Sequence, residues 1–194
     1  MLFVFVLALF VLGLQEAANR FGFIPLEWSA GGWLQNPTQA VLSPLASQFL
    51  PTDFFSLIFN GIFLLIAGRY VEKALGPVGL GVVFAAGAYG GALARLLLTS
   101  GSSLASAGAT PAVFAVIGAY LMLYGVPRGI PIAQRQTRLV QIAALAGVWL
   151  ALQLAFMLAA GQFELSVSIV EPMGGLIAGV AIAQPLMRWR YRKA

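Results

Sequence analysis

Six apolar stretches are the feature that most limits how this chain can fold. They lie at Leu2–Leu14, Phe54–Val71, Pro77–Leu98, Pro111–Val126, Leu139–Ala160 and Leu165–Met187. A helix that crosses a bilayer needs about 20 mostly apolar residues, and all but the first stretch approach that length. A soluble domain of 194 residues, 60% hydrophobic and 9% charged, could not bury this much apolar surface. We therefore expect an all-α membrane protein, a single domain over residues 1–194 with six transmembrane helices.

The distribution of charge predicts the orientation of these helices. Nine of the eleven basic residues fall on one side of a six-span arrangement: Arg69, Lys73, Arg128, Arg135, Arg138, Arg188, Arg190, Arg192 and Lys193. An excess of Lys and Arg marks the cytoplasmic side, so we expect both termini in the cytoplasm and place the protein in a bacterial inner membrane. Beside a membrane helix, the basic tail favours anionic lipid headgroups as partners over nucleic acid.

The long connection between the first two spans, at about residues 15–52, is the only extended segment outside the apolar stretches. It carries Phe21, Phe23, Trp28, Trp33 and Phe49 among Gly, Pro, Ser and Asn. Aromatic side chains of this kind favour the membrane–water boundary. We expect this connection to lie at the interface.

Local patterns indicate where several helices begin. Thr52 and Asp53 precede the second apolar stretch, as helix N-caps do. Ser168 and Glu171 have the spacing of a capping box at the start of the sixth. Thr110 precedes Pro111, and proline favours the first helical position, so we expect Thr110 to cap the fourth helix.

The residue inventory excludes most hydrolytic chemistries. The chain has no histidine and no cysteine, which removes thiol catalysis and the usual zinc ligands, so we expect no metal and no cofactor. Asp53 is the only aspartate, so an aspartic pair is absent. Glu171 is the one acid placed within a span. It is a candidate for a functional group or for a polar pair with Arg95.

Three blocks in the sequence resemble the rhomboid family of intramembrane serine proteases. "SQFLPTDFFSLIFNGIFLLIAGRYVEKALG" is similar to the family's second-helix block, and "GATPAVFAVIGAYL" to the block with its nucleophile motif. "EPMGGLIAGVAIAQPL" is similar to the sixth-helix block. The resemblance runs from about Phe23 to Leu186. It implies a rhomboid-like bundle of six transmembrane helices.

The departures from the family pattern fall on the catalytic positions. The resemblance assigns the nucleophilic serine to Thr110 and the catalytic histidine to Pro172. It assigns an oxyanion-stabilising histidine to Ser56, whereas Asn60 keeps the family's residue. A Thr hydroxyl without a base is a poor nucleophile at neutral pH. We therefore expect no catalytic residue here and interpret these four positions as a degenerate site.

The resemblance then implies an inactive rhomboid-like protein, a pseudoprotease whose partners are membrane lipids and the transmembrane helices of client proteins. Two alternatives stay open. One is an active rhomboid-family serine-type endopeptidase with an unrecognised base, for which Glu171 is the candidate. The other is a small transporter or channel, although few charges lie within the spans.

Overall fold

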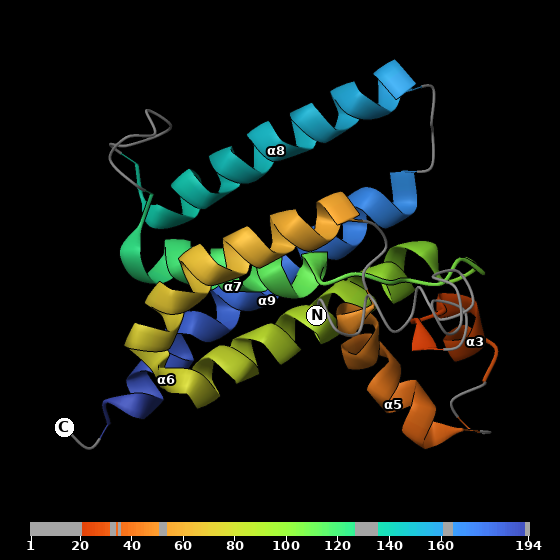
Figure 1. Cartoon of the computed structure of the whole chain (residues 1–194), viewed down its shortest axis with the longest axis horizontal. Coiled ribbons are helices and arrows are strands. Elements are labelled where there is room, and N and C mark those ends of the chain that lie inside the picture. The colour runs from red at the N-terminus through yellow and green to blue at the C-terminus, as the bar shows by residue number, and fades with distance from the viewer. Residues whose placement is uncertain are drawn as a thin grey trace.

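The computed structural model describes residues 21–31, 34, 36–50, 54–126, 136–160 and 165–192 (Figure 1). Within these residues the chain is built from helices: α3 Pro25–Ser29, α5 Pro37–Ala46, a 3-10 turn Ser47–Phe49, α6 Phe54–Thr99, α7 Thr110–Tyr124, α8 Arg138–Ala160 and α9 Leu165–Arg190. The predicted all-α architecture is confirmed. The first predicted span, Leu2–Leu14, and the predicted caps Thr52 and Asp53 lie outside the described residues.

Helix α6 contains two of the predicted spans, joined by a kink. Gly76 has φ 79° and ψ 171°, a backbone conformation that residues other than glycine rarely adopt, and Pro77 follows it. Proline is well suited to the first turn of the next helix. The first arm (residues 54–75) and the second arm (residues 77–99) are each about 33 Å long, enough to cross a bilayer.

Apolar length and outward-facing apolar side chains mark this as an integral membrane protein. Among the described residues, Ser56–Thr99 and Ile169–Arg190 are long and apolar enough to cross a membrane, and Thr110–Tyr124 and Arg138–Ala151 are shorter apolar helices. Several large side chains are more than 70% exposed, namely Leu65, Val78, Leu97 and Leu98. Such a surface is unfavourable in water but is covered by acyl chains in a bilayer.

Helix α7 forms the centre of the bundle, which explains why it can be short and still apolar throughout. It packs between α6 and α9, while α8 lies at the outside (Figure 1). Five of its side chains are 0% exposed: Ala112, Val113, Ala115, Val116 and Ala119. Because these residues are small, neighbouring helices approach α7 closely.

Glycines bring the backbones of α7 and α9 into direct contact. A Cβ atom on Gly175 would overlap the carbonyl oxygen of Pro111, and one on Gly179 would overlap the carbonyl oxygen of Ala115. These two glycines are four residues apart and therefore share one face of α9. The start of α7 is thus fixed against α9 by backbone packing.

The connection before α6 contains helical segments and is tied to the bundle. Phe23 and Ser106 exchange two backbone hydrogen bonds, of 3.1 and 2.8 Å, in an isolated antiparallel bridge. Phe23 is 1% exposed, so it packs inside the protein and does not face lipid. Trp28 donates from its indole nitrogen to the carbonyl of Ala40 over 3.2 Å. Trp33 lies outside the described residues, and the interfacial position of the connection stays a prediction.

Candidate functional site

Thr110 is the first residue of α7 and lies beside Asn60 of α6. The side-chain amide of Asn60 donates a hydrogen bond to the Thr110 hydroxyl over 3.2 Å. Asn60 is 3% exposed, and its Oδ1 has no hydrogen-bond partner within the part of the chain that the structure describes. Ser56 lies one turn earlier, on the same side of α6, and is partly buried. The structure therefore brings Thr110 and Asn60 together, with Ser56 nearby on the same helix.

The cap of α7 is supplied by a residue that the sequence analysis missed. Oε1 of Gln48 accepts a hydrogen bond from the backbone N–H of Ala112 over 3.3 Å, and Gln48 Nε2 donates to the carbonyl of Pro44 over 3.0 Å. The N-cap residue is Ala109, which has no capping side chain. Our prediction that Thr110 caps this helix is therefore wrong. The Thr110 hydroxyl accepts from Asn60, and Gln48 satisfies one of the free N–H groups at the helix start.

The segment before Thr110 is held in place by backbone contacts with the preceding connection. Gly108 donates its N–H to the carbonyl of Ser47 over 2.9 Å, directly beside Gln48. Gly108 has φ 114°, which a residue with a Cβ atom rarely adopts. Two residues earlier, Ser106 is bridged to Phe23. The hydroxyl of Thr110 thus sits at the end of a fixed segment.

Pro172 lies inside α9, on the part of that helix that packs against the start of α7. It is buried. A Cβ atom on Gly91 of the second arm of α6 would lie 2.7 Å from Pro111 Cβ and 3.0 Å from the carbonyl oxygen of Glu171. Gly91 of α6, Pro111 of α7 and Glu171 of α9 therefore meet at one level of the bundle, next to Pro172. A proline side chain at this level can neither accept nor donate a proton.

A buried polar cluster joins α6, α9 and the segment before α7. Arg95 Nη1 lies 2.7 Å from Glu171 Oε1, and the two side chains are 0% and 7% exposed. Arg95 Nη2 donates to the carbonyl of Leu104 over 2.6 Å and to the Ser102 hydroxyl over 3.4 Å. The Ser106 hydroxyl donates to Glu171 Oε2 over 2.6 Å. Both carboxylate oxygens of Glu171 are therefore occupied by donors.

This arrangement contradicts the capping box predicted for Glu171. Helix α9 begins at Leu165, so Glu171 lies in its second turn, beyond the free N–H groups of the helix start. Its carboxylate binds Arg95 and Ser106 instead. The sequence indicated Arg95 as a candidate partner of Glu171, and the structure shows the pair. One guanidinium atom, Arg95 Nε, has no hydrogen-bond partner in the described part of the chain.

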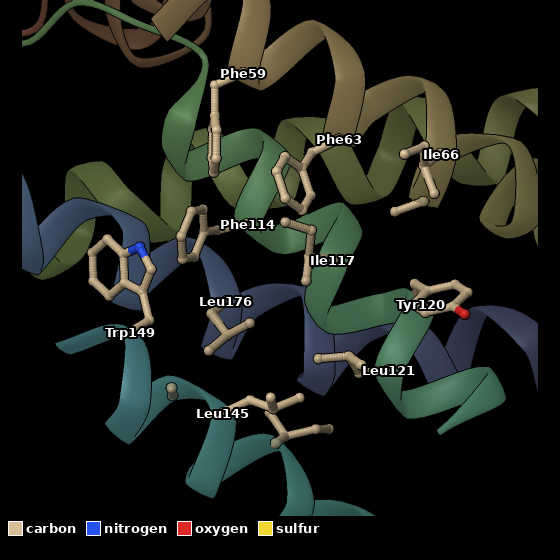
Figure 2. Close-up of a pocket in the computed structure, with 13 residues that line it drawn as sticks. Phe59, Phe63, Ile66, Phe114, Ile117, Tyr120, Leu121, Leu145, Trp149 and Leu176 are labelled. Carbon is tan, nitrogen blue, oxygen red and sulfur yellow. The ribbon is translucent and has the colours of Figure 1, made fainter. Parts of the chain in front are cut away.

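An apolar cleft of about 380 Å³ opens between the first arm of α6 and α8, beside the Thr110 site. Side chains of α6, α7, α8 and α9 turn toward this common space (Figure 2). The cleft is lined by Phe59, Phe63, Ile66, Ala67, Phe114, Ile117, Tyr120, Leu121, Ile142, Leu145, Ala146, Trp149 and Leu176. Phe114 and Trp149 meet edge to face, with ring centroids 4.9 Å apart. The cleft is suited to an apolar ligand.

The comparisons with known proteins agree with this architecture. The family model described as the Rhomboid domain matches residues 39–189 of the 194. The chain belongs to the rhomboid family. No curated protein and no solved structure matches the chain.

The rhomboid match begins within α5 and ends in the last turn of α9, so it covers α6, α7, α8 and most of α9 and leaves out α3. In this rhomboid protein, the position that the resemblance assigns to the nucleophile carries Thr110, and the position assigned to its base carries Pro172. Asn60 contacts the Thr110 hydroxyl directly. Gln48, which caps the start of α7, lies within the matched region as well.

Proposed function

We propose that this rhomboid-family protein is catalytically inactive and binds the transmembrane helices of client proteins. The observation that carries the first half of the proposal is the environment of Thr110. Of the residues the structure describes, its hydroxyl has one recorded hydrogen-bond partner, Asn60, and the amide donates to the hydroxyl and cannot take its proton. The whole chain contains no histidine. Nucleophilic attack by a hydroxyl needs a base that removes its proton.

Glu171 is poorly placed to serve as that base. Its Oε1 already accepts from Arg95 and its Oε2 from Ser106, and within the described residues the Thr110 hydroxyl bonds to Asn60 and not to Glu171. A general base must reach the proton that it removes within about 2.6–3.2 Å or through one water. These contacts favour a structural role for Glu171 over the alternative of an active endopeptidase.

The cleft supports the second half of the proposal. Its lining is almost wholly apolar and is built from the first arm of α6 and from α7, α8 and α9 (Figure 2). In a bilayer, apolar helices gain little by leaving lipid, so close packing against a complementary surface decides whether they associate. An aromatic cleft at the edge of the bundle offers such a surface to one apolar helix. Binding there requires no chemistry at Thr110.

Incubation of the purified protein with a rhomboid substrate in liposomes tests the inactivity. We expect no specific product. A specific product that disappears in Thr110→Ala would establish an active protease and refute the proposal. Loss of the same product in Glu171→Gln, with the fold retained, would identify the base.

Repair of the degenerate site gives a second test. The double variant Thr110→Ser/Pro172→His restores the two dyad residue types, and we expect little or no turnover from it. Ser56 still stands where the family has an oxyanion-stabilising histidine, and the loss of one such donor typically costs about 10²–10³ in rate. Pro111 also restricts the backbone conformation of residue 110 and with it the direction of the hydroxyl. Adding Ser56→His and Pro111→Gly should therefore raise the rate above that of the pair. Robust turnover by the pair alone would refute this account of Ser56 and Pro111.

Crosslinking tests the binding of client helices. A photoreactive residue at Phe63, in the cleft, should crosslink a rhomboid substrate's transmembrane segment in liposomes. The matched control is the same residue at Val78, which is 73% exposed and does not line the cleft. We expect Ala146→Trp to abolish the Phe63 crosslink, because the larger side chain fills the cleft. Equal crosslinking from both positions would show that the segment contacts the bundle nonspecifically.

Basic residues in contact with the end of α7 and with the kink of α6 support a cytoplasmic position for the C-terminal end of the bundle; the cytoplasmic N-terminus and the bacterial inner membrane stay predictions from the sequence. Arg138 donates to the carbonyls of Met122 and Leu123 at the end of α7, over 2.7 and 3.0 Å. At the kink of α6, the guanidinium of Arg190 lies against Gly76. Basic residues that gather at one end of a bundle favour the cytoplasmic side for that end. A reporter fused after the last residue should therefore be active only in the cytoplasm, and a non-cytoplasmic signal would refute the orientation.

A further inference from the structure

A second hollow lies at the kink of α6, away from the Thr110 site. Its volume is about 990 Å³. It is lined by Leu64, Leu65, Ile66, Gly68, Arg69, Tyr70, Glu72, Lys73 and Leu80, and we call it the basic groove. Of the residues that line the apolar cleft, only Ile66 also lines the basic groove. The groove is therefore a separate surface, with leucines along one part and charged groups along the other.

Two cations in the groove have no partner within the described part of the chain. Arg69 and Lys73 are four residues apart on the first arm of α6, so they lie on one face of the helix, and both are exposed. Neither has a hydrogen bond or an ion pair with any residue of the described chain. Glu72 also lines the groove, but its carboxylate is not paired with either cation at 4.0 Å or less in the described structure. The two positive charges are thus available to an anion from outside the protein.

Tyrosines place this surface at the boundary between lipid and water. The rings of Tyr70, Tyr120 and Tyr124 contact one another with centroids 5.5–5.7 Å apart. The Tyr124 hydroxyl donates to the carbonyl of Tyr70 over 3.1 Å. Tyrosine is enriched where a membrane protein passes from the acyl chains to the headgroups. Arg69 and Lys73, one residue before and three after Tyr70, then lie at the depth of lipid phosphates.

The apolar part of the groove faces the acyl chains. Leu65 is 75% exposed and lies one turn before Arg69, and Leu80 approaches from the second arm of α6. An exposed leucine beside an unpaired cation gives a water-soluble anion no additional contact. A phospholipid matches both features, because its phosphate can bind the cations while its acyl chain covers the leucines.

We propose that the basic groove binds an anionic phospholipid, with its phosphate between Arg69 and Lys73 and an acyl chain along Leu64, Leu65 and Leu80. An arginine guanidinium binds phosphate oxygens through two parallel hydrogen bonds, whereas lysine acts as a point charge. A basic pocket between transmembrane helices is a recognised type of site for anionic headgroups. Glu72 weakens the attraction, so its neutralisation strengthens binding.

Native mass spectrometry of the detergent-solubilised full chain tests this site. The probes are phosphatidylglycerol and phosphatidylcholine of matched acyl chains, titrated separately. We expect the wild type to bind the first phosphatidylglycerol at least tenfold more tightly than phosphatidylcholine. Each basic side chain near an anionic headgroup contributes about fivefold in affinity, so Arg69→Gln/Lys73→Gln should lower phosphatidylglycerol binding about 25-fold. Phosphatidylcholine binding should fall much less, because its choline cation offsets the charge of its phosphate.

Three comparisons keep the result interpretable. Arg188→Gln/Arg192→Gln removes the same charge from the last turns of the chain, outside the groove, and should lower binding less than threefold. Glu72→Gln should raise phosphatidylglycerol binding about fivefold, and this variant loses no cation on which folding could depend. Inorganic phosphate should not raise the thermal unfolding temperature, whereas phosphatidylglycerol should.

Other results would overturn the proposal. Equal losses in the groove and tail variants would show attraction by overall charge only. Unchanged or weaker binding in Glu72→Gln would show that the anion does not lie in the groove. Stabilisation by inorganic phosphate equal to that by phosphatidylglycerol would assign the site to a free anion.

Discussion

The ion pair of Arg95 and Glu171 offers the sharpest test of what holds this bundle together. Glu171→Met removes the carboxylate and leaves a guanidinium that is 0% exposed with only the Leu104 carbonyl and the Ser102 hydroxyl as partners. Removing one partner of a buried ion pair typically costs about 3–5 kcal/mol, because the other charge stays buried and uncompensated. Arg95→Met should cost a similar amount, because it leaves the carboxylate with the Ser106 hydroxyl alone.

The double variant Arg95→Met/Glu171→Met distinguishes the energy of the ion pair itself from the energy of the bonds that the two side chains make to their neighbours. Both charges are then gone, and methionines of similar length fill the space. What remains lost are the hydrogen bonds to the Leu104 carbonyl and from the Ser106 hydroxyl, worth about 1 kcal/mol each, and the longer bond of 3.4 Å to the Ser102 hydroxyl, which contributes less. We therefore expect the double variant to lose about 2 kcal/mol and to be more stable than either single variant. Ser106→Ala alone should cost about 1 kcal/mol.

The assay is equilibrium unfolding of the four proteins in bicelles, with helix content and tryptophan fluorescence as two independent probes. The control cycle uses Arg188→Met and Glu27→Met, two exposed residues with no ion pair between them in the described structure. Each should change the free energy of unfolding by less than about 0.5 kcal/mol, and the two effects should add. Additive losses for Arg95 and Glu171, with the double variant the least stable, would refute the reasoning.

Two further predictions address the start of α7. Gly175→Ala should cost about 1–3 kcal/mol in unfolding free energy, because the new methyl group meets the backbone carbonyl of Pro111. Gly147→Ala, whose methyl group would have nothing within 4 Å, should be neutral or stabilising. Equal effects of the two variants in the same bicelle assay would contradict the close backbone contact. Gln48→Met should cost about 1 kcal/mol and speed amide exchange at Ala112, and unchanged exchange there would show that Gln48 does not cap the helix.

The apolar stretches predicted the fold well because each is long and its limits are marked by strong signals. Gly76 and Pro77 are an example: a glycine that can take positive φ, then a proline that starts the next helix, separate the two arms of α6 at the place the sequence indicates. An apolar segment in a bilayer forms a helix because its backbone N–H and C=O groups must bond to one another within the segment. That requirement is local and therefore readable from the chain.

The contacts at the helix starts were not readable in the same way. The cap of α7 comes from Gln48, which is 64 residues away from the N–H group that it binds. The pair of Glu171 with Arg95 was predicted, because few charges lie within the spans, but the bonds of these two side chains to Leu104 and Ser106 were not. The spacing of Ser168 and Glu171 matches a capping box, but such a pattern has meaning only if the helix begins at Ser168. Helix α9 begins three residues earlier, at Leu165, and Glu171 is then inside it.

The remaining polar groups of the bundle explain how a rhomboid protein without a dyad can keep the fold around it. Gln48, Arg95 and Glu171 each make at least one hydrogen bond to the segment from Ser102 to Ala112, which leads into α7. This segment would have to be held in place whether or not Thr110 reacts, because α7 is the buried centre against which α6 and α9 pack. The packing of α7 therefore accounts for these contacts, whether or not the protein is catalytically active. A surface that depends on the same framework, the apolar cleft, is then preserved independently of catalysis.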